Sequence, residues 1–114
     1  MTLSQIKKCV RFCQNVLKVR DWEIEIEYGN IQPEWVTGDD AVGACVTDNN
    51  HLVAKIWVSS SAQNPIQTTC HEMLHVMTLG AGEFKLKQSE FISYHIEEML
   101  YGHFLRQKKC TKKR

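Results

Sequence analysis

The sequence has no long apolar run and no excess of charge of one sign. Its 114 residues carry a formal net charge of +1. None of its apolar stretches approaches the roughly 20 residues that span a bilayer as a helix. The first residues, MTLSQIKKCVRFCQ, lack the apolar core and the small-residue cleavage site of a signal peptide. We therefore expect a cytoplasmic protein with no membrane partner and no strongly charged partner.

The sequence also lacks a disulfide framework. Its five cysteines are an odd number with irregular spacing: Cys9, Cys13, Cys45, Cys70 and Cys110. Cys9 and Cys13 are four residues apart on a predicted helix and could chelate a metal. No CxxC motif accompanies them, however, and both fall near the apolar stripe of that helix. We therefore interpret them as buried thiols, and Cys70, which lies on another apolar stripe, as a packing residue rather than a nucleophile.

Composition and length predict one globular domain. The chain is 43% apolar and contains no repeats or internal linkers, so it can bury a modest core. We predict a single domain over residues 1–107, followed by a basic tail over 108–114. This tail would permit contact with nucleic acid, although a short basic terminus is more typical of a solvated end.

Hydrophobic periodicity predicts six elements. Apolar residues at helical spacing follow Thr2, which with Gln5 resembles a capping box. The segment WEIEIEY alternates strictly between apolar and acidic residues, as half-buried strands do. The predicted elements are a helix over 3–19, strands over 22–28, 41–47 and 52–58, a helix from 65, and a last helix over about 85–107. The order α-β-β-β-α-α predicts an α+β fold with a small, mostly antiparallel sheet packed against helices.

The penultimate predicted helix carries an HExxH motif, His-Glu-Met-Leu-His. Asn64 supplies its N-cap, and Pro65 takes the first helical position, where proline is favoured. Histidines four residues apart lie on one helical face, so His71 and His75 can bind one Zn²⁺ ion. Glu72 lies beside them and can act as a general base. The alternative interpretation is a histidine pair with a structural role.

A catalytic zinc needs a third protein ligand and an open position for water. No HExxHxxGxxH extension follows the motif, since the next residues read MTLGAGEF. We therefore expect the third ligand from the last helix, where the candidates are Glu90, His95, Glu97 and Glu98. The predicted core face of this helix consists of Ile92, Ile96, Met99 and His103. Glu90 lies roughly opposite that face and near the start of the helix, so we rank it first.

The predicted strand over 52–58 ends shortly before the HExxH helix. We expect it to be an edge strand that forms a hairpin with the strand over 41–47. A free strand edge along the cleft can pair with an extended peptide and hold it over the metal.

These features resemble the small zincin-like metallopeptidases of phages and prophages, which are related to the ImmA/IrrE type and distantly to the gluzincins. The resemblance rests on the strand WEIEIEY, the segment AKIWV, the helix TTCHEMLHVMTL and the last-helix pattern that begins at Glu90. It covers nearly the whole chain, but only HExxH is highly specific. It implies a minimal zincin-like domain with one zinc ion per chain and, if the chain is phage-encoded, a location in the cytoplasm of a bacterial host cell. The family's third ligand is a glutamate that opens an E-x-V-V-like run, which maps to Glu90 in the run EFIS.

Motif and resemblance together predict zinc-dependent hydrolysis of a peptide or protein substrate, with water activated by zinc and Glu72. A donor must also stabilise the oxyanion. The candidates are Tyr94, Tyr101, His51 and His103, and the sequence does not choose between them. Two alternatives remain. One is a non-catalytic zinc-binding regulatory protein of a phage. The other is a SprT-like protease that acts on proteins bound to nucleic acid, which the basic tail suggests.

Overall fold

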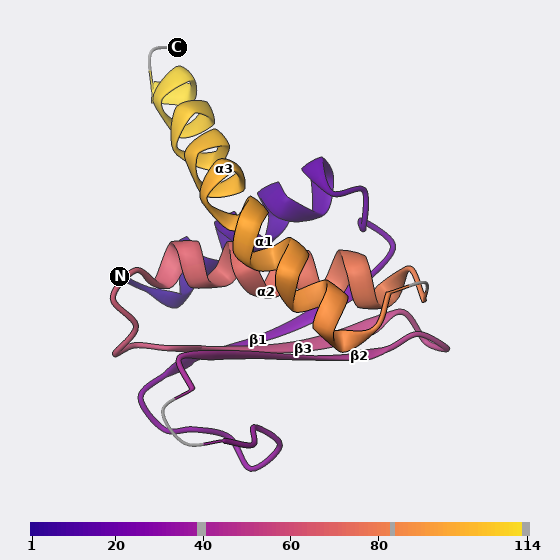
Figure 1. Ribbon diagram of the computed structural model, residues 1–114. Coiled ribbons are helices and arrows are strands. Elements are labelled where there is room, and N and C mark those ends of the chain that lie inside the picture. The colour runs from indigo at the N-terminus through magenta and orange to yellow at the C-terminus, as the bar shows by residue number, and fades with distance from the viewer. Residues whose placement is uncertain (39–40, 83, 113–114) are drawn as a thin grey trace.

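Helices cover one face of a three-stranded sheet in the computed structural model, which describes residues 1–38, 41–82 and 84–112 (Figure 1). The elements of this part of the chain are α1 (Leu3–Val16), β1 (Glu23–Gly29), β2 (Gly43–Asp48), β3 (Val53–Ser59), α2 (Pro65–Gly80) and α3 (Leu86–Lys112). The predicted α+β class and element order are confirmed. α1 and α2 pack on the sheet and α3 packs on α2, so α2 lies between α3 and the sheet.

β3 is the central strand of the sheet. The strand order is β1-β3-β2, with β1 parallel to β3 and β2 antiparallel to it in the predicted hairpin. The sheet is therefore mixed rather than mostly antiparallel, and the prediction that 52–58 is an edge strand is wrong. From Ile56 to Ser59 every residue of β3 is buried, so both faces of the strand are covered there. A nearly continuous apolar run of this kind is typical of a central strand.

The first helix and the first strand follow local signals in the sequence. The capping box of Thr2 and Gln5 is present at the start of α1. α1 ends at Val16 rather than at residue 19, because Lys18 adopts a left-handed backbone with φ 59°. The alternation of β1 is confirmed, since its three glutamates are all exposed: Glu23, Glu25 and Glu27.

α2 presents an apolar face and a polar face. The Asn64 side chain accepts a hydrogen bond from the backbone N–H of Gln67 at 3.2 Å, and Pro65 is the first helical residue, as predicted. The apolar stripe is buried in the core and contains Ile66, Cys70, Met73 and Leu74. The polar stripe contains Thr68, His71, His75 and Thr78. Because this stripe is polar, the side chains of α3 that pack against it need not be apolar.

The predicted core face of α3 is wrong. Met99 is 70% exposed and Ile96 is 37% exposed, whereas Ser89, Ser93 and Leu100 are buried. The reason is that the first half of α3 packs on the polar stripe of α2 rather than on an apolar surface. Small serine side chains allow the two helices to approach. Ser89 Oγ bonds to His75 and Thr78 of that stripe, whereas the buried Ser93 Oγ has no hydrogen-bond partner among the described residues.

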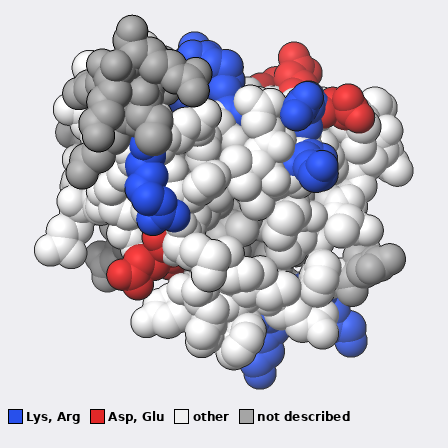
Figure 2. Space-filling model, turned by 90° about the horizontal axis from the view of Figure 1, so that it is seen from above, with Lys and Arg blue, Asp and Glu red and all other residues white. Residues whose placement is uncertain are grey.

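α3 is longer than predicted and runs to Lys112. Its backbone thus includes much of the segment predicted as a basic tail, of which residues 113–114 lie outside the described residues. Viewed from the side of the helices, the surface is largely uncharged, with scattered basic side chains and a few acidic ones (Figure 2). Strongly exposed apolar side chains of α3 are Leu86, Phe91, Tyr94 and Met99. Within the described part of the chain, no helix is both long and apolar enough to cross a membrane.

Candidate metal centre

His71 and His75 lie one turn apart on α2 and converge with Glu90 of α3. The Nε2 atom of His71 is 2.8 Å from Glu90 Oε1, and the Nε2 atom of His75 is 3.2 Å from Glu90 Oε2. The possible ligand atoms of the three residues all lie within 4.8 Å of one another. Two imidazole nitrogens and one carboxylate are a donor set found in catalytic zinc sites. These residues therefore form a possible metal site, and they suit the zinc ion that the motif implies.

The other ring nitrogen of each histidine has its own partner. Nδ1 of His71 lies 3.2 Å from Glu97 Oε1, and the Gln67 side chain donates a hydrogen bond of 3.1 Å to the second oxygen of Glu97. Nδ1 of His75 lies 2.6 Å from Ser89 Oγ, which also bonds to Thr78 Oγ1. Such partners set the ring orientation of histidine ligands. Both rings are thus held with Nε2 pointing toward the same place.

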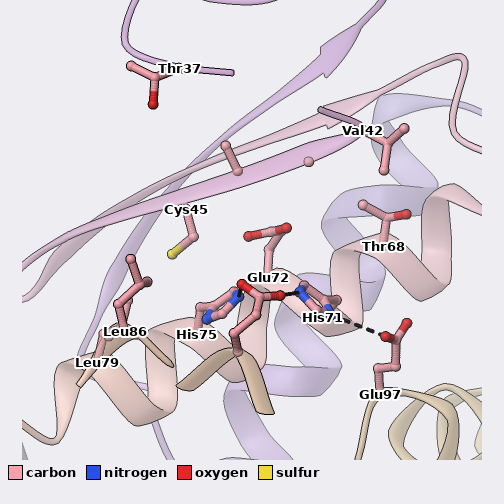
Figure 3. Close-up of a pocket in the computed structure, with 13 residues that line it drawn as sticks. Thr37, Val42, Cys45, Thr68, His71, Glu72, His75, Leu79, Leu86 and Glu97 are labelled. Atoms are coloured by element: carbon pink, nitrogen blue, oxygen red, sulfur yellow. Dashed lines mark hydrogen bonds and ion pairs between the residues drawn. The ribbon is translucent and has the colours of Figure 1, made fainter. Parts of the chain in front are cut away.

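Glu72 lies beside the two histidines and faces the strands (Figure 3). Its side chain sits under the start of β2, where the backbone passes very closely. A Cβ atom added at Gly43 would be 2.9 Å from Glu72 Oε2 and 2.7 Å from Thr68 Cγ2. A side chain at position 43 would therefore compete with Glu72 for space, which gives this glycine a steric role in the site.

Burial shifts the protonation of two groups in the site. It raises the pKa of the Glu72 carboxyl to about 7, against the effect of His71, while Glu90 and Glu97 add to the rise. Burial lowers the pKa of His75, against the effect of the Glu90 carboxylate. A lowered pKa favours neutral imidazole, which is the form that binds a metal.

A cavity of about 550 Å³ opens beside these residues. Its walls come from α2, from the first half of α3, from Gly43, Ala44 and Cys45 of β2, and from Thr37 and Val42 in the segment before β2. Its volume lies within the usual range of sites for small ligands. Because β2 is at the edge of the sheet in the described part of the chain, one side of this strand is left unpaired next to the cavity.

The other candidates for a third ligand do not lie between the Nε2 atoms of the two histidines. Glu97 reaches His71, but at Nδ1 rather than at the point where the two Nε2 atoms converge. Glu98 is exposed. His95 is also exposed, and its Nδ1 atom lies 2.8 Å from the carbonyl oxygen of Phe91 in its own helix.

None of the four candidates for oxyanion stabilisation lines this cavity. His51 lies in the β2–β3 turn beside Asp48. The His103 ring packs at a tilt against that of Phe12, with the ring centroids 5.3 Å apart, Tyr101 packs against the core, and Tyr94 is 71% exposed. The sequence analysis also missed Gly43 and Ser89. The only sequence signal for Ser89 is its spacing of four from Ser93, which places two small residues on one helical face.

Comparison of the chain with models of protein families, with curated proteins and with solved structures gives no match. The geometry described above therefore carries the functional argument.

The raised pKa of Glu72 predicts a pH dependence in the metal-free protein. Its folded pKa of about 7 lies above the ordinary value of 4.5, so the folded state holds this proton more tightly. Stability from this group is therefore fully present below pH 4.5 and is lost as the pH rises to about 7. Compared with Glu72→Gln, the wild-type chain should lose up to about 3 kcal/mol across this window. Urea unfolding of both proteins in a chelator would measure the difference, and parallel pH profiles would contradict the prediction.

Proposed function

We propose that the protein is a zinc-dependent peptidase that cleaves an extended peptide segment. The observation that carries this proposal is the convergence of His71 Nε2, His75 Nε2 and the Glu90 carboxylate, with Glu72 beside them in one cavity. The resemblance of the motif to zincin-like metallopeptidases supports the same activity. The open position that such a donor set leaves is where substrate chemistry takes place in catalytic zinc sites.

Glu72 is the proposed proton carrier. When bound, zinc lowers the pKa of water and polarises the scissile carbonyl. Glu72 accepts a proton from the attacking water and then passes it to the departing amine. In the metal-free chain, burial raises the pKa of this carboxyl to about 7, so its surroundings accommodate the protonated form as well as the charged one. Glu97 and Ser89 keep the two imidazole rings in place through their Nδ1 atoms.

β2 is the proposed binding surface for the substrate backbone. Its first three residues line the cavity, and its outer edge is unpaired in the described residues. An extended peptide that pairs with this edge would lie along the row formed by His71, Glu72 and His75. β2 thereby takes the role that the sequence analysis assigned to residues 52–58.

Removal and return of zinc test the proposal. The folded chain should hold one chelator-accessible zinc ion in the cleft and cleave members of a library of fluorescence-quenched peptides. Cleavage should stop when a chelator removes this ion and return when zinc is added back. A folded chain that takes up no zinc after reconstitution, as measured by elemental analysis, would overturn the proposed site.

The close approach of β2 predicts a strong effect of Gly43→Ala. The added methyl group would displace Glu72 or Thr68, because its Cβ would come within 3 Å of both side chains. We expect kcat to fall on the order of 10- to 100-fold with zinc content retained, and stability to fall by about 1–3 kcal/mol. Gly29→Ala is the matched control, since a Cβ there meets nothing within 4 Å. An unchanged kcat in Gly43→Ala would show that β2 does not position Glu72.

One observation favours a second candidate, a zinc-binding protein without catalysis. No tyrosine, lysine or arginine is among the described residues that line the cavity, so the neutral side-chain donors there for an oxyanion are the hydroxyls of Thr37 and Thr68. In that case the centre would hold its ion to bind a partner, and Glu72 would be dispensable.

A further inference from the structure

Three cysteines converge in the core between α1 and α2. Cys9 and Cys13 lie one turn apart on α1, and Cys70 reaches them from the apolar face of α2. All three are 0% exposed. The sulfur atoms of Cys9 and Cys70 are 3.7 Å apart, and the three sulfurs all lie within 4.8 Å of one another. The proposed peptidase chemistry uses none of these three cysteines.

We propose that Cys9, Cys13 and Cys70 form a second metal site, which holds a thiophilic divalent cation such as Zn²⁺. Zinc binds thiolate sulfur at about 2.3 Å, so sulfurs in tetrahedral or trigonal sites are separated by about 3.8–4.0 Å. The distance of 3.7 Å between Cys9 and Cys70 is close to this spacing. Two donors four residues apart on one helix, with a third from a neighbouring helix, repeat the arrangement of the His71, His75 and Glu90 centre.

The arrangement suits an ion better than a disulfide. A disulfide bond is about 2.0 Å long, so a bond between Cys9 and Cys70 would require the two packed helices to close further. It would also leave the third converging thiol without a role. An ion at the centre of the three sulfurs, which lie within 4.8 Å of one another, would use all of them. The Cys9 thiol donates a weak hydrogen bond of 3.9 Å to the Ile66 carbonyl oxygen, so an oxygen atom also lies beside the cluster.

Charge balance favours a divalent cation over a monovalent one. Binding one Zn²⁺ to three thiols releases three protons and leaves a net charge of −1, whereas a monovalent copper ion would leave −2. Buried charge is costly in an apolar core, so the smaller residual charge is favoured. Because the sulfurs are inaccessible in the folded chain, the ion must be bound as α1 docks on α2. It should then exchange slowly, unlike an ion in the open cleft.

Counting metal ions after chelation tests this inference. The full chain produced with zinc should contain two zinc ions, of which a chelator removes one while the chain is folded and the other only on unfolding. His71→Ala should keep the chelator-resistant ion, and Cys70→Ala should lose it. Cys45→Ala, a half-buried cysteine outside the cluster, should keep it and serves as the matched control.

The wild-type chain gives a readout that does not depend on how the variants fold. Refolded with Co²⁺, it should show the intense thiolate-to-cobalt charge-transfer absorption, which should persist in His71→Ala. Absence of this absorption and of any chelator-resistant ion would overturn the inference and leave the peptidase proposal standing. A chelator-resistant ion without any chelator-accessible one would support the cysteine site and contradict the cleft site.

Discussion

Replacing Glu72 by glutamine is expected to reduce peptide hydrolysis by about 10²- to 10⁴-fold. Glutamine keeps the size of the side chain but cannot accept the proton of the attacking water. The metal ligands are not altered, so the folded structure and the zinc content should be retained. Single-turnover cleavage of a peptide substrate, together with elemental analysis of the same sample, measures both quantities.

Glu98→Gln is the matched control for this experiment. It makes the same change of charge at an exposed position of α3, and its hydrolysis rate should equal that of the wild-type chain. Undiminished hydrolysis in Glu72→Gln would show that Glu72 is not the base. A wild-type chain that binds zinc in the cleft but cleaves no peptide would favour the zinc-binding protein without catalysis.

Glu90→Ala is expected to cause the largest loss of zinc affinity among the acidic residues of α3. Its carboxylate is the one placed between the Nε2 atoms of His71 and His75, at 2.8 and 3.2 Å. Loss of an outer partner of a metal ligand typically costs about 10–100-fold in affinity. Loss of a charged ligand should exceed that range. Competition with a zinc-binding dye measures the affinity.

Glu97→Gln and Glu98→Gln calibrate this effect. Glu97 contacts the far nitrogen of His71, so its change should weaken zinc binding about 10–100-fold. Glu98 is exposed, and its change should have no measurable effect. A wild-type affinity in Glu90→Ala, combined with a large loss in Glu97→Gln, would mean that Glu97 is the third ligand.

Local patterns in the sequence predicted the part of the site that lies on α2. The cap at Asn64, the proline after it and the apolar stripe all act within a few residues along the chain. They determine where the helix begins and which face is buried. Once that face is known, His71 and His75 must lie together on another face, because their spacing of four is one helical turn.

The arrangement of the strands and of α3 could not be predicted in the same way. Strand order depends on how the chain crosses from β1 to the far edge of the sheet before β3 fills the centre, and no local pattern encodes that path. The buried face of α3 depends on its partner. Because α2 offers a polar stripe there, Ser89 is buried and Met99 is exposed, against the ordinary preference of both residue types.

By itself the sequence determined the order of the elements, the helix that carries HExxH, and the pairing of His71 with His75 on one face. Only the tertiary structure decided that Glu90 reaches both Nε2 atoms and that Glu97 and Ser89 contact the Nδ1 atoms of the two rings. It placed β2 beside the cavity. It also decided that Cys70 meets the two cysteines of α1. The physical reason is the range of the interactions: helix caps and periodicity act over a few neighbouring residues, whereas these contacts join segments far apart in the chain and form only when the helices pack.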